Sequence, residues 1–450
     1  MSSKFRKVKL GEILIFKTGK LDSNAAENNG AYPFFTCSPV TLSINSYAFD
    51  DEVVLLAGNN ANGVFSVKYY NGKFNAYQRT YVISPIDNTE VNMRWLYFRI
   101  KHVTSELQQM SVGTATKFLT KKILDSFEIE LPPLQEQAYQ ADILWSLQEK
   151  ITNNEAINQT LEQMAQALFK SWFLDFEPVE AKVAVLEAGG SQEEATLAAM
   201  TAISGKDADS LIVFEKEHPE KFAELKATAK LFPSAMQDSE LGEIPKGWCI
   251  KTYDQFCDFV QSGGTPKRSE PAYWENGCIK WLSSGEVRGK IVLDTKEKIT
   301  DAGLNNSSAK LWPKHSTVMA MYGATAGEIC LLAEDMSANQ ACCALHSINS
   351  PFFTYFSLCN ISTEISSKAS GSAQQNLNKG IISETKICIP NDNILSDYEN
   401  KIHSIMMAWI SNVKLSRGLS MLRNTLLPKL LSGEITLPEV EQAVSEAENV

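Results

Sequence analysis

Leu134–Phe173 is the stretch that most constrains how this chain can fold. Its apolar side chains recur every three or four residues with one interruption, at Leu144, Leu147, Ile151, Ile157, Leu161, Met164 and Leu168. Such spacing is typical of a long amphipathic helix whose apolar stripe packs against another helix. At 1.5 Å per residue, roughly forty helical residues form a rod of about 60 Å.

The stripe returns 258 residues further along the chain, as Ile402, Ile405, Trp409, Leu415, Leu419, Leu422 and Leu426. The polar residue Asn154 returns with it, as Asn412. A single polar residue in an apolar seam can fix the register and the partner of a helix. We therefore expect the two helices to pair with Asn154 near Asn412. The alternative is that both asparagines point to solvent.

The segments before the two helices also correspond to each other. Four matches occur in the same order: Phe16–Gly19 with Val260–Gly263, Gly58–Phe65 with Gly323–Cys330, Ala76–Gln78 with Ala338–Gln340, and Met110–Pro133 with Lys368–Asn391. Chance does not explain four ordered matches, and a repeat this long is a duplicated globular module rather than a solenoid. The predicted fold is α+β: two homologous mixed α/β domains, each followed by a long helix, with the helices paired as an antiparallel coiled coil.

Local patterns predict several elements of the first domain. MRWLYFRIKHVTSELQQM (93–110) has helical spacing, and three strands are expected between residues 50 and 84. The Asn71-Gly72 pair is a strong hairpin signal. Pro132 and Pro133 are expected to end a strand just before the first long helix.

Composition permits a nucleic-acid partner without requiring one. The formal net charge is −11, but the acidity is concentrated in connecting segments: residues 176–240 contain 13 acidic and 6 basic side chains. Nine cysteines form no CxxC pair and are expected to be reduced and structural. The sequence has neither a signal-peptide pattern nor a run of about 18 apolar residues, so we expect a cytoplasmic protein with no membrane contact.

The known catalytic and cofactor motifs are missing from the sequence. There is no phosphate-binding loop, dinucleotide fingerprint, HExxH, GxSxG or [DN]PP[FY] tetrapeptide, and the five histidines lack metal-ligand spacing. We therefore expect a binding protein with no catalytic residues and no metal. The alternative is an enzyme with an unfamiliar site, built on Asp50, Asp51 and Glu52 or on Glu328 and Asp335.

Two related but diverged domains on a spacer suit two different short elements at a fixed distance on one polymer. Asn and Gln can pair with adenine, Arg and Lys with guanine, and Lys also with phosphate. The polar loop residues that we predict to bind DNA are Asn59, Asn60, Asn62, Lys73, Arg79, Thr114, Thr116 and Lys117 in the first domain. In the second they are Lys267, Arg268, Tyr322, Thr325, Ser372, Gln374, Gln375, Asn378 and Lys379. The alternative for each is a solvated loop side chain.

Three motifs carry a resemblance to a known family. LPPLQEQ (131–137), ELGEIPKGW (240–248) and LRNTLLPKLLSGEI (422–435) resemble the domain and helix junctions of type I restriction–modification specificity subunits, over essentially the whole chain. The second junction departs from the pattern, because Pro390–Asn393 lacks the full PPLxEQ sequence. That departure puts in doubt how the second helix begins.

The resemblance implies a domain order and a set of partners. The expected segments are target-recognition domain 1 (1–133), helix 1 (134–175), an acidic connector (176–240), target-recognition domain 2 (241–392), helix 2 (393–435) and an acidic tail (436–450). Such a subunit is non-catalytic, and each domain recognises one half of a bipartite, asymmetric DNA site. Two methyltransferase subunits dock along the helices and restriction/translocase subunits join them. S-adenosylmethionine, ATP and Mg²⁺ bind to those partners. The alternative is a tandem DNA-binding specificity module of another methylation or phage-defence assembly without a nuclease.

Large apolar side chains on the two helices are candidates for partner contacts. They are Trp145, Phe169, Trp172, Phe173 and Trp409. If they are exposed they mark an interface, since large exposed apolar patches signal binding sites. The alternative is that they only seal the helix pair.

Overall fold

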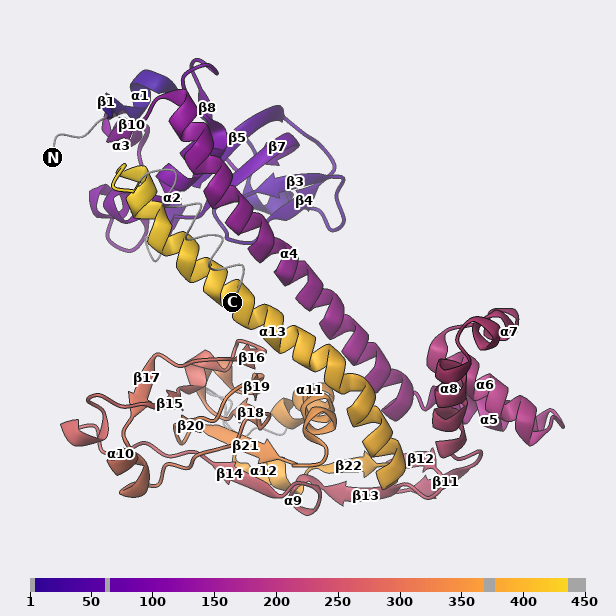
Figure 1. Ribbon diagram of the computed structural model, residues 1–450. Coiled ribbons are helices and arrows are strands. Elements are labelled where there is room, and N and C mark those ends of the chain that lie inside the picture. Colours follow the sequence, from indigo (N-terminus) through magenta and orange to yellow (C-terminus); the bar gives the residue numbers. More distant parts are fainter. Residues whose placement is uncertain (1–4, 61–64, 368–376, 436–450) are drawn as a thin grey trace. The chain divides into compact units, whose positions relative to one another are not determined.

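The computed structural model describes residues 5–60, 65–367 and 377–435 of the chain (Figure 1). Contacts divide it into two compact units, Met1–Asn153 with Ser416–Val450, and Asn154–Leu415. Two forty-residue helices, α4 (Leu134–Phe173) and α13 (Asp392–Leu431), each contribute to both units, since α4 is divided after Asn153 and α13 after Leu415. Helix α4 covers the stretch in which the apolar stripe predicts a helix.

A six-stranded sheet forms the centre of the first unit, in the order β2-β8-β5-β7-β3-β4. Its strands are β2 (Leu14–Thr18), β3 (Tyr32–Phe35), β4 (Leu42–Ile44), β5 (Phe49–Ala57), β7 (Val67–Ala76) and β8 (Thr80–Pro85). Side chains of β5 alternate between two apolar clusters, Val54 and Leu56 on one face and Val53 and Leu55 on the other. This alternation is what a strand buried on both faces requires.

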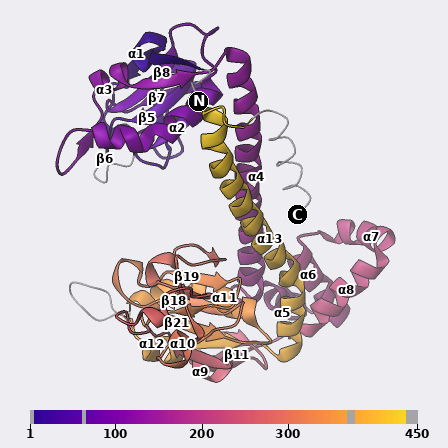
Figure 2. The same ribbon diagram turned by 60° about the vertical axis from the view of Figure 1, so that its left-hand side comes forward.

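Helix α2 (Met93–Met110) packs on the face of Val54 and Leu56 (Figure 2). It begins where the Asn92 side chain accepts a hydrogen bond from the Trp95 amide, a standard helix cap. Its bounds confirm the helix predicted at 93–110. The remaining elements of this unit are β1 (Arg6–Lys9), α1 (Leu10–Ile13), η1 (Ser23–Ala25), β6 (Asn59–Asn60), β9 (Lys117–Phe118), α3 (Lys121–Ser126) and β10 (Glu128–Leu131).

The hairpin predicted at Asn71-Gly72 is wrong. Both residues lie inside β7, where Asn71 pairs with Glu52 and Gly72 with Asp51 of β5. The long antiparallel register of β5 and β7 therefore continues through the dipeptide. Gly72 takes a φ of +132°, a conformation that glycine adopts readily within the strand.

The second unit holds a five-stranded sheet, β14-β21-β18-β19-β16, and a three-stranded sheet, β17-β15-β20. The strands are β13 (Cys249–Thr252), β14 (Phe259–Ser262), β15 (Ile279–Leu282), β16 (Ile291–Val292), β17 (Glu297–Ile299), β18 (Thr317–Ala320), β19 (Ile329–Leu332), β20 (Ser337–Ala338), β21 (Cys342–His346) and β22 (Lys386–Ile389). The helices are α9 (Tyr253–Phe256), η2 (Pro271–Tyr273), η3 (Ser284–Glu286), α10 (Asp301–Asn305), η4 (Gly323–Thr325), α11 (Pro351–Ser367) and α12 (Lys379–Glu384).

Backbone details confirm the internal duplication. The Leu10 amide donates to the Phe127 carbonyl, and the Tyr253 amide donates to the Thr385 carbonyl in the matching place. Gly19 and Gly263, which the sequence aligns, both press against backbone: a Cβ would lie 1.7 Å from the oxygen of Ala76 and 2.4 Å from that of Ala338. Each repeat therefore needs glycine for the same close approach.

The acidic connector is an ordered helical subdomain of the second unit. Its elements are α5 (Glu177–Glu187), α6 (Gln192–Ser204), α7 (Ala208–Glu217), α8 (Pro219–Leu231) and β11 (Met236–Ser239). Strand β11 pairs with β12 (Gly242–Pro245), which follows the connector. Ala199, Met200, Leu211 and Ala229 form a small core of their own. The Thr228 hydroxyl bonds to Asp397 at 3.0 Å, which ties α8 to α13.

The long helices run antiparallel, as predicted. In the first unit Leu144, Leu147 and Ile151 of α4 share a core with Leu419, Leu426 and Leu430 of α13, and Arg423 donates to Gln148. In the second unit Trp172, near the end of α4, lies 6.0 Å from Tyr398, near the start of α13. Early turns of one helix therefore lie beside late turns of the other.

Three residues of the predicted apolar stripe are exposed instead of buried. Ile157 and Leu415 are each 48% exposed and Met164 is 53% exposed. The reason is helical geometry: the six residues from Ile151 to Ile157 turn the chain by about 600°, which leaves Ile157 about 120° from the buried stripe.

Asn154 and Asn412 are both half-buried in the second unit. The Asn154 amide nitrogen has no hydrogen-bond partner among the described residues. Their mutual contact stays a prediction.

Four of the five large apolar side chains proposed as exposed are buried instead. Phe169, Trp172, Phe173 and Trp409 are at most 5% exposed and lie in the main core of the second unit. Trp145 is half-buried and packs edge-on against Tyr69 of the first domain. Large aromatic rings gain most by filling the helix–domain interior. The expectation that these residues are exposed is therefore wrong, and the alternative that they seal the chain's own core fits their positions.

The nine cysteines are all free. Burial raises the pKa of Cys257, Cys342 and Cys343 to about 12, so these thiols stay protonated and unreactive. None of the described helices is both long and apolar enough to cross a membrane.

Candidate nucleic-acid interface

The first domain brings several predicted residues together at a two-stranded ribbon. Strand β6 pairs with β9, so Asn59 lies opposite Phe118 and Asn60 opposite Lys117. The guanidinium of Arg79, from the turn before β8, lies over the Phe118 ring at 5.4 Å. Amide, cationic and aromatic side chains from three separate segments therefore share one small surface.

A tight loop adds two hydroxyl side chains to this surface. Val112 and Phe118 exchange backbone hydrogen bonds of 3.0 and 2.8 Å, which close the loop that carries Thr114 and Thr116. Gly113 takes a φ of +110°, and a Cβ there would lie 2.1 Å from the Thr116 carbonyl oxygen. Only glycine allows this turn.

Backbone hydrogen bonds fix the ribbon to the sheet. The Gly58 amide donates to the Arg79 carbonyl at 2.8 Å, and the Leu119 amide donates to the Gly58 carbonyl at 2.9 Å. We call the surface of Asn59, Asn60, Arg79, Thr114, Thr116 and Lys117 the first junction. Lys73 is not part of it. On β7 its backbone lies opposite Asp50, at the other end of β5, seven residues or about 23 Å from Ala57. Asn62 lies outside the described residues.

The second domain repeats this junction with different side chains. The Leu377 amide donates to the Met321 carbonyl at 2.9 Å, the counterpart of the bond between Leu119 and Gly58. Met321, rather than the sequence-matched Gly323, therefore takes the place of Gly58, and its amide likewise donates to the Ala341 carbonyl at 2.7 Å. The bond between Leu377 and Met321 places Asn378 and Lys379 beside Tyr322, and these three exposed residues form the second junction. Thr325 is only 7% exposed, and Asn378 uses its side-chain oxygen to cap α12. Ser372, Gln374 and Gln375 lie outside the described residues.

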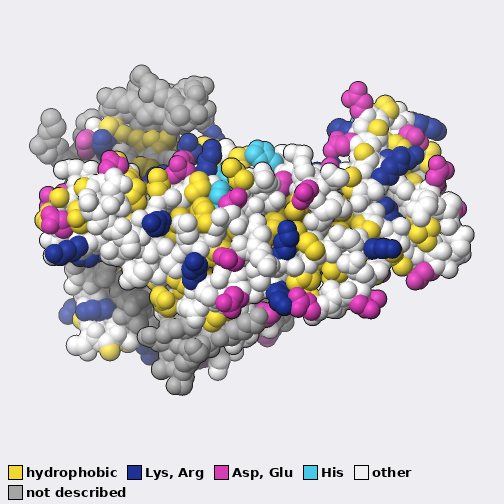
Figure 3. All heavy atoms as spheres, turned by 90° about the horizontal axis from the view of Figure 1, so that it is seen from below, with side chains coloured by type: hydrophobic (Ala, Val, Ile, Leu, Met, Phe, Trp, Pro, Cys, Tyr) yellow, Lys and Arg dark blue, Asp and Glu magenta, His cyan; other side chains and the backbone are white. Residues whose placement is uncertain are grey.

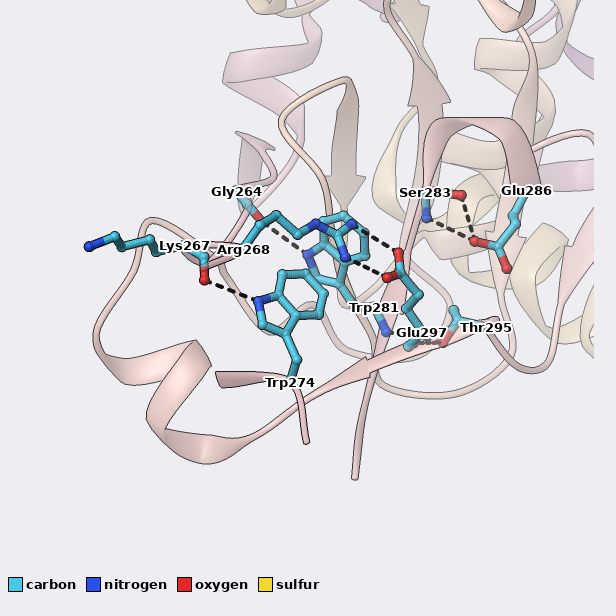
Figure 4. A network of polar contacts seen from close by, with 9 residues as sticks. All are labelled: Gly264, Lys267, Arg268, Trp274, Trp281, Ser283, Glu286, Thr295 and Glu297. Carbon is cyan, nitrogen blue, oxygen red and sulfur yellow. Dashed lines mark hydrogen bonds and ion pairs between the residues drawn. The ribbon is translucent and has the colours of Figure 1, made fainter. Parts of the chain in front are cut away.

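Lys267 and Arg268 lie in a separate loop that is held by aromatic residues (Figure 4). The Arg268 guanidinium lies 3.9 Å from the Trp274 ring and 4.8 Å from the Trp281 ring, and it binds both carboxylate oxygens of Glu297. That pairing raises the pKa of Arg268 and lowers the pKa of Glu297. Arg268 therefore holds the loop in place through its stacked, two-pronged contacts.

The loop is also fixed through its backbone. Trp274 Nε1 donates to the Lys267 carbonyl at 3.2 Å, and Trp281 Nε1 donates to the Gly264 carbonyl at 3.0 Å. The Lys267 side chain points away from this cluster (Figure 4) and is exposed. It is the member of the pair that is available to a phosphate.

The acidic residues weighed for an enzyme have other roles or surroundings. Asp50, Asp51 and Glu52 lie on exposed positions of β5, and Glu52 accepts a hydrogen bond from the Tyr69 hydroxyl at 2.7 Å. Asp335 accepts the Lys314 amide at 2.8 Å, and Glu328 is exposed. No group of three or more His, Cys, Asp or Glu in the described ranges is arranged to hold a metal ion.

Charge on the surface is mixed rather than concentrated. On the face shown in Figure 3, Lys and Arg side chains alternate with Asp and Glu, and neither sign forms a broad patch. The sequence patterns did not identify the aromatic residues that contact the two arginines. These are Phe118, which lies under Arg79, and Trp274 and Trp281, which lie beside Arg268. Nothing in their local pattern distinguishes them from core residues.

Comparison with known proteins identifies the family. A family model described as the type I restriction modification DNA specificity domain matches residues 2–163 and 245–420. The chain is 33% identical over 331 residues to the type I restriction enzyme HindI specificity subunit of Haemophilus influenzae, covering 70% of this chain and 71% of that protein. It is 34% identical over 264 residues to the EcoDI specificity subunit of Escherichia coli, covering 58% and 51%.

A solved structure shares the fold. The S subunit of the type I restriction-modification system from M. genitalium matches with a TM-score of 0.57 at 13% identity, over 95% of this chain and 96% of that one. The family model covers both domains. The match to the HindI specificity subunit spans more than two thirds of this chain and of that protein. This chain therefore belongs to the family of type I restriction–modification specificity subunits.

Proposed function

We propose that this chain recognises a bipartite, asymmetric DNA site for a type I restriction–modification complex, one half with each domain. The observation that carries the proposal is the repeated junction. The Leu119–Gly58 and Leu377–Met321 bonds are equivalent, yet the polar side chains around them differ. One scaffold with two sets of polar side chains suits two different half-sites.

The chemistry of each junction fits direct recognition of bases. Asn59 presents an amide that can pair with adenine, and Arg79 and Lys117 present donors suited to guanine or phosphate. In the second domain Tyr322 and Lys379 supply a ring and a cation, while Lys267 contacts phosphate from its own loop. Thr325 and Arg268 are removed from the set of base-contacting candidates, because the first is buried and the second is engaged with Glu297.

Partner subunits supply the chemistry in this proposal. Two methyltransferase subunits bind along α4 and α13, and restriction/translocase subunits join them; S-adenosylmethionine, ATP and Mg²⁺ bind to those partners and this chain is non-catalytic. Large apolar side chains that stay exposed on the two helices are the candidates for these docking contacts. They are Ile157, Met164, Leu415 and Met421.

The test is methylation by the reconstituted complex on a library of DNA sites. The complex contains this chain and a methyltransferase subunit of the same restriction–modification system. Asn59→Ala with Asn60→Ala should relax the base preference in one half-site only, and Lys379→Ala with Tyr322→Ala in the other half-site only. Lys73→Ala is the matched control, because Lys73 lies at the opposite end of the sheet. A uniform loss over both half-sites in either double variant would refute the assignment of one half to each domain.

A further inference from the structure

Polar side chains of each long helix make hydrogen bonds at the N-terminal end of a second helix. Helix α4 does so with α2 in the first domain, and α13 with α11 in the second. In the first domain, Gln137 accepts the Asn92 amide at 2.9 Å and donates to the carbonyls of Glu90 and Pro132 at 3.0 and 2.8 Å. One turn later, Gln140 accepts Trp95 Nε1 at 2.9 Å. Both glutamines are at most 3% exposed. Apart from the bond to Pro132, which lies just before α4, these contacts are made at the N-terminal end of α2.

The second domain makes the same connection with a different residue. One oxygen of Glu399 on α13, Oε1, accepts the amides of Phe352 and Phe353 at 3.1 and 2.8 Å. These amides belong to the first turn of α11, where backbone N–H groups have no acceptor inside the helix. The sequence counterpart of Gln137 is Leu395, one turn before Glu399. The connection is therefore present in both repeats although different residues at different positions make it.

Glu399 makes this contact at an energetic cost. Burial raises the pKa of its carboxyl to about 8, even though the amides of Phe353 and Phe352 favour the anion. An apolar side chain would hold α11 on α13 without that penalty. What the hydrogen bonds add is direction, because the amides at a helix start point along its axis. A side chain that accepts two of them fixes where that axis points.

The far ends of these helices lie at the recognition junctions. Helix α2 ends at Met110, one residue before the loop segment that carries Thr114 and Thr116. Near the end of α11, Ser366 Oγ lies 2.3 Å from where a Cβ on Gly327 would stand, five residues after Tyr322 of the second junction. Eighteen residues span about 27 Å, so a tilt of about 5° at the start moves the far end by about 2 Å. Hydrogen bonds to bases tolerate only a few tenths of an ångström.

We infer that Gln137, Gln140 and Glu399 are positioning residues, which aim each domain's DNA-contacting loops from the long helix without touching DNA themselves. The inference rests on the proposed function. Gln137 and Gln140 aim the first junction, and Glu399 aims the second. Loosening one contact lets that domain tilt, so the protein accepts DNA in which the half-sites have a different separation.

The test measures methylation by the reconstituted complex on sites whose spacer is the native length, one base pair shorter or one longer. Glu399→Ala should reduce the preference for the native spacer by about tenfold, equivalent to about 1.4 kcal/mol of lost discrimination. Glu399→Gln should restore it, because the amide oxygen can accept both amides in place of Oε1. Gln137→Ala should also reduce the preference, by the same mechanism in the other domain.

Thr228→Val is the matched control. It removes the hydrogen bond from Thr228 on α8 to Asp397, which lies on α13 two residues before Glu399. It leaves the contacts between Glu399 and α11 in place. It should lower the melting temperature and leave the spacer preference unchanged. If Glu399→Ala prevents folding, Glu399→Asp supplies the milder loss, and the same reduction in spacer preference is expected. An unchanged preference in Glu399→Ala or Glu399→Asp, or an equal change in Thr228→Val, would overturn the inference. A wild-type complex that methylates no bipartite site would instead overturn the proposed function.

Discussion

Glu399 makes the stability of the second unit depend on pH in a direction that can be calculated. Its carboxyl has a pKa of about 8 in the folded chain, against an ordinary value of 4.5. The folded state therefore binds this proton more tightly than the unfolded state. The stabilisation is complete below about pH 4.5 and is lost as the pH rises through about 8.

The size of the effect follows from the shift. Each pH unit between about 5 and 8 lowers the free energy of unfolding by about 1.4 kcal/mol through this group. Glu399→Gln keeps an oxygen for the amides of Phe352 and Phe353 but cannot ionise. The difference in unfolding free energy between this variant and the wild type should grow by about 1.4 kcal/mol per pH unit over that window.

The assay is urea unfolding of the full chain from pH 5 to 9, followed by circular dichroism. Burial lowers the pKa of His315, whose ring lies 5.4 Å from that of Phe352, but this group is common to both proteins and largely cancels in the difference. Thr228→Val controls for a general loss of stability, since its difference from the wild type should not depend on pH. A pH-independent difference for Glu399→Gln would refute the reasoning.

Five further substitutions test other parts of the structure. Arg268→Ala removes the stacking on two indole rings and should lower the unfolding free energy by about 1–2 kcal/mol, whereas Lys267→Ala should weaken DNA binding with no change in melting temperature. Gly113→Ala forces a Cβ against a carbonyl oxygen, so recognition of one half-site should fail while the domain stays folded by circular dichroism. Trp172→Ala should destabilise the chain by about 3–5 kcal/mol, because the ring is fully buried, whereas Ile157→Ser should weaken methyltransferase binding in pull-downs without lowering stability.

The sequence predicted the architecture well because the architecture depends on periodic patterns and on the repeat. Helix α4 and helix α2 have the bounds that apolar spacing indicated, and Gly19 and Gly263 occupy the same close contact. The hairpin at Asn71-Gly72 failed because tertiary strand pairing overrode a local turn preference. The aromatic residues on the helices were placed wrongly because a sequence does not show which side of a helix its own domains cover.

Individual site residues were harder to predict for the same reason. Asn59, Arg79 and Lys117 come together through strand pairing and a cation–ring contact that no local motif records. Arg268 looked like a base-contacting residue because its partner, Glu297, lies 29 positions away. The internal repeat could not predict the contacts of Glu399, because the residue at its equivalent position in the first repeat is Ala141. In that repeat Gln137 makes the corresponding contacts.

The most direct test of the central claim is sequencing of modified bases in the host genome with this gene intact and with it deleted. The account predicts that one bipartite adenine-methylated motif disappears on deletion, which would also give both half-sites and their spacer. An unchanged pattern of methylation, with the neighbouring methyltransferase subunit shown to be expressed, would contradict the claim that this chain supplies the sequence specificity.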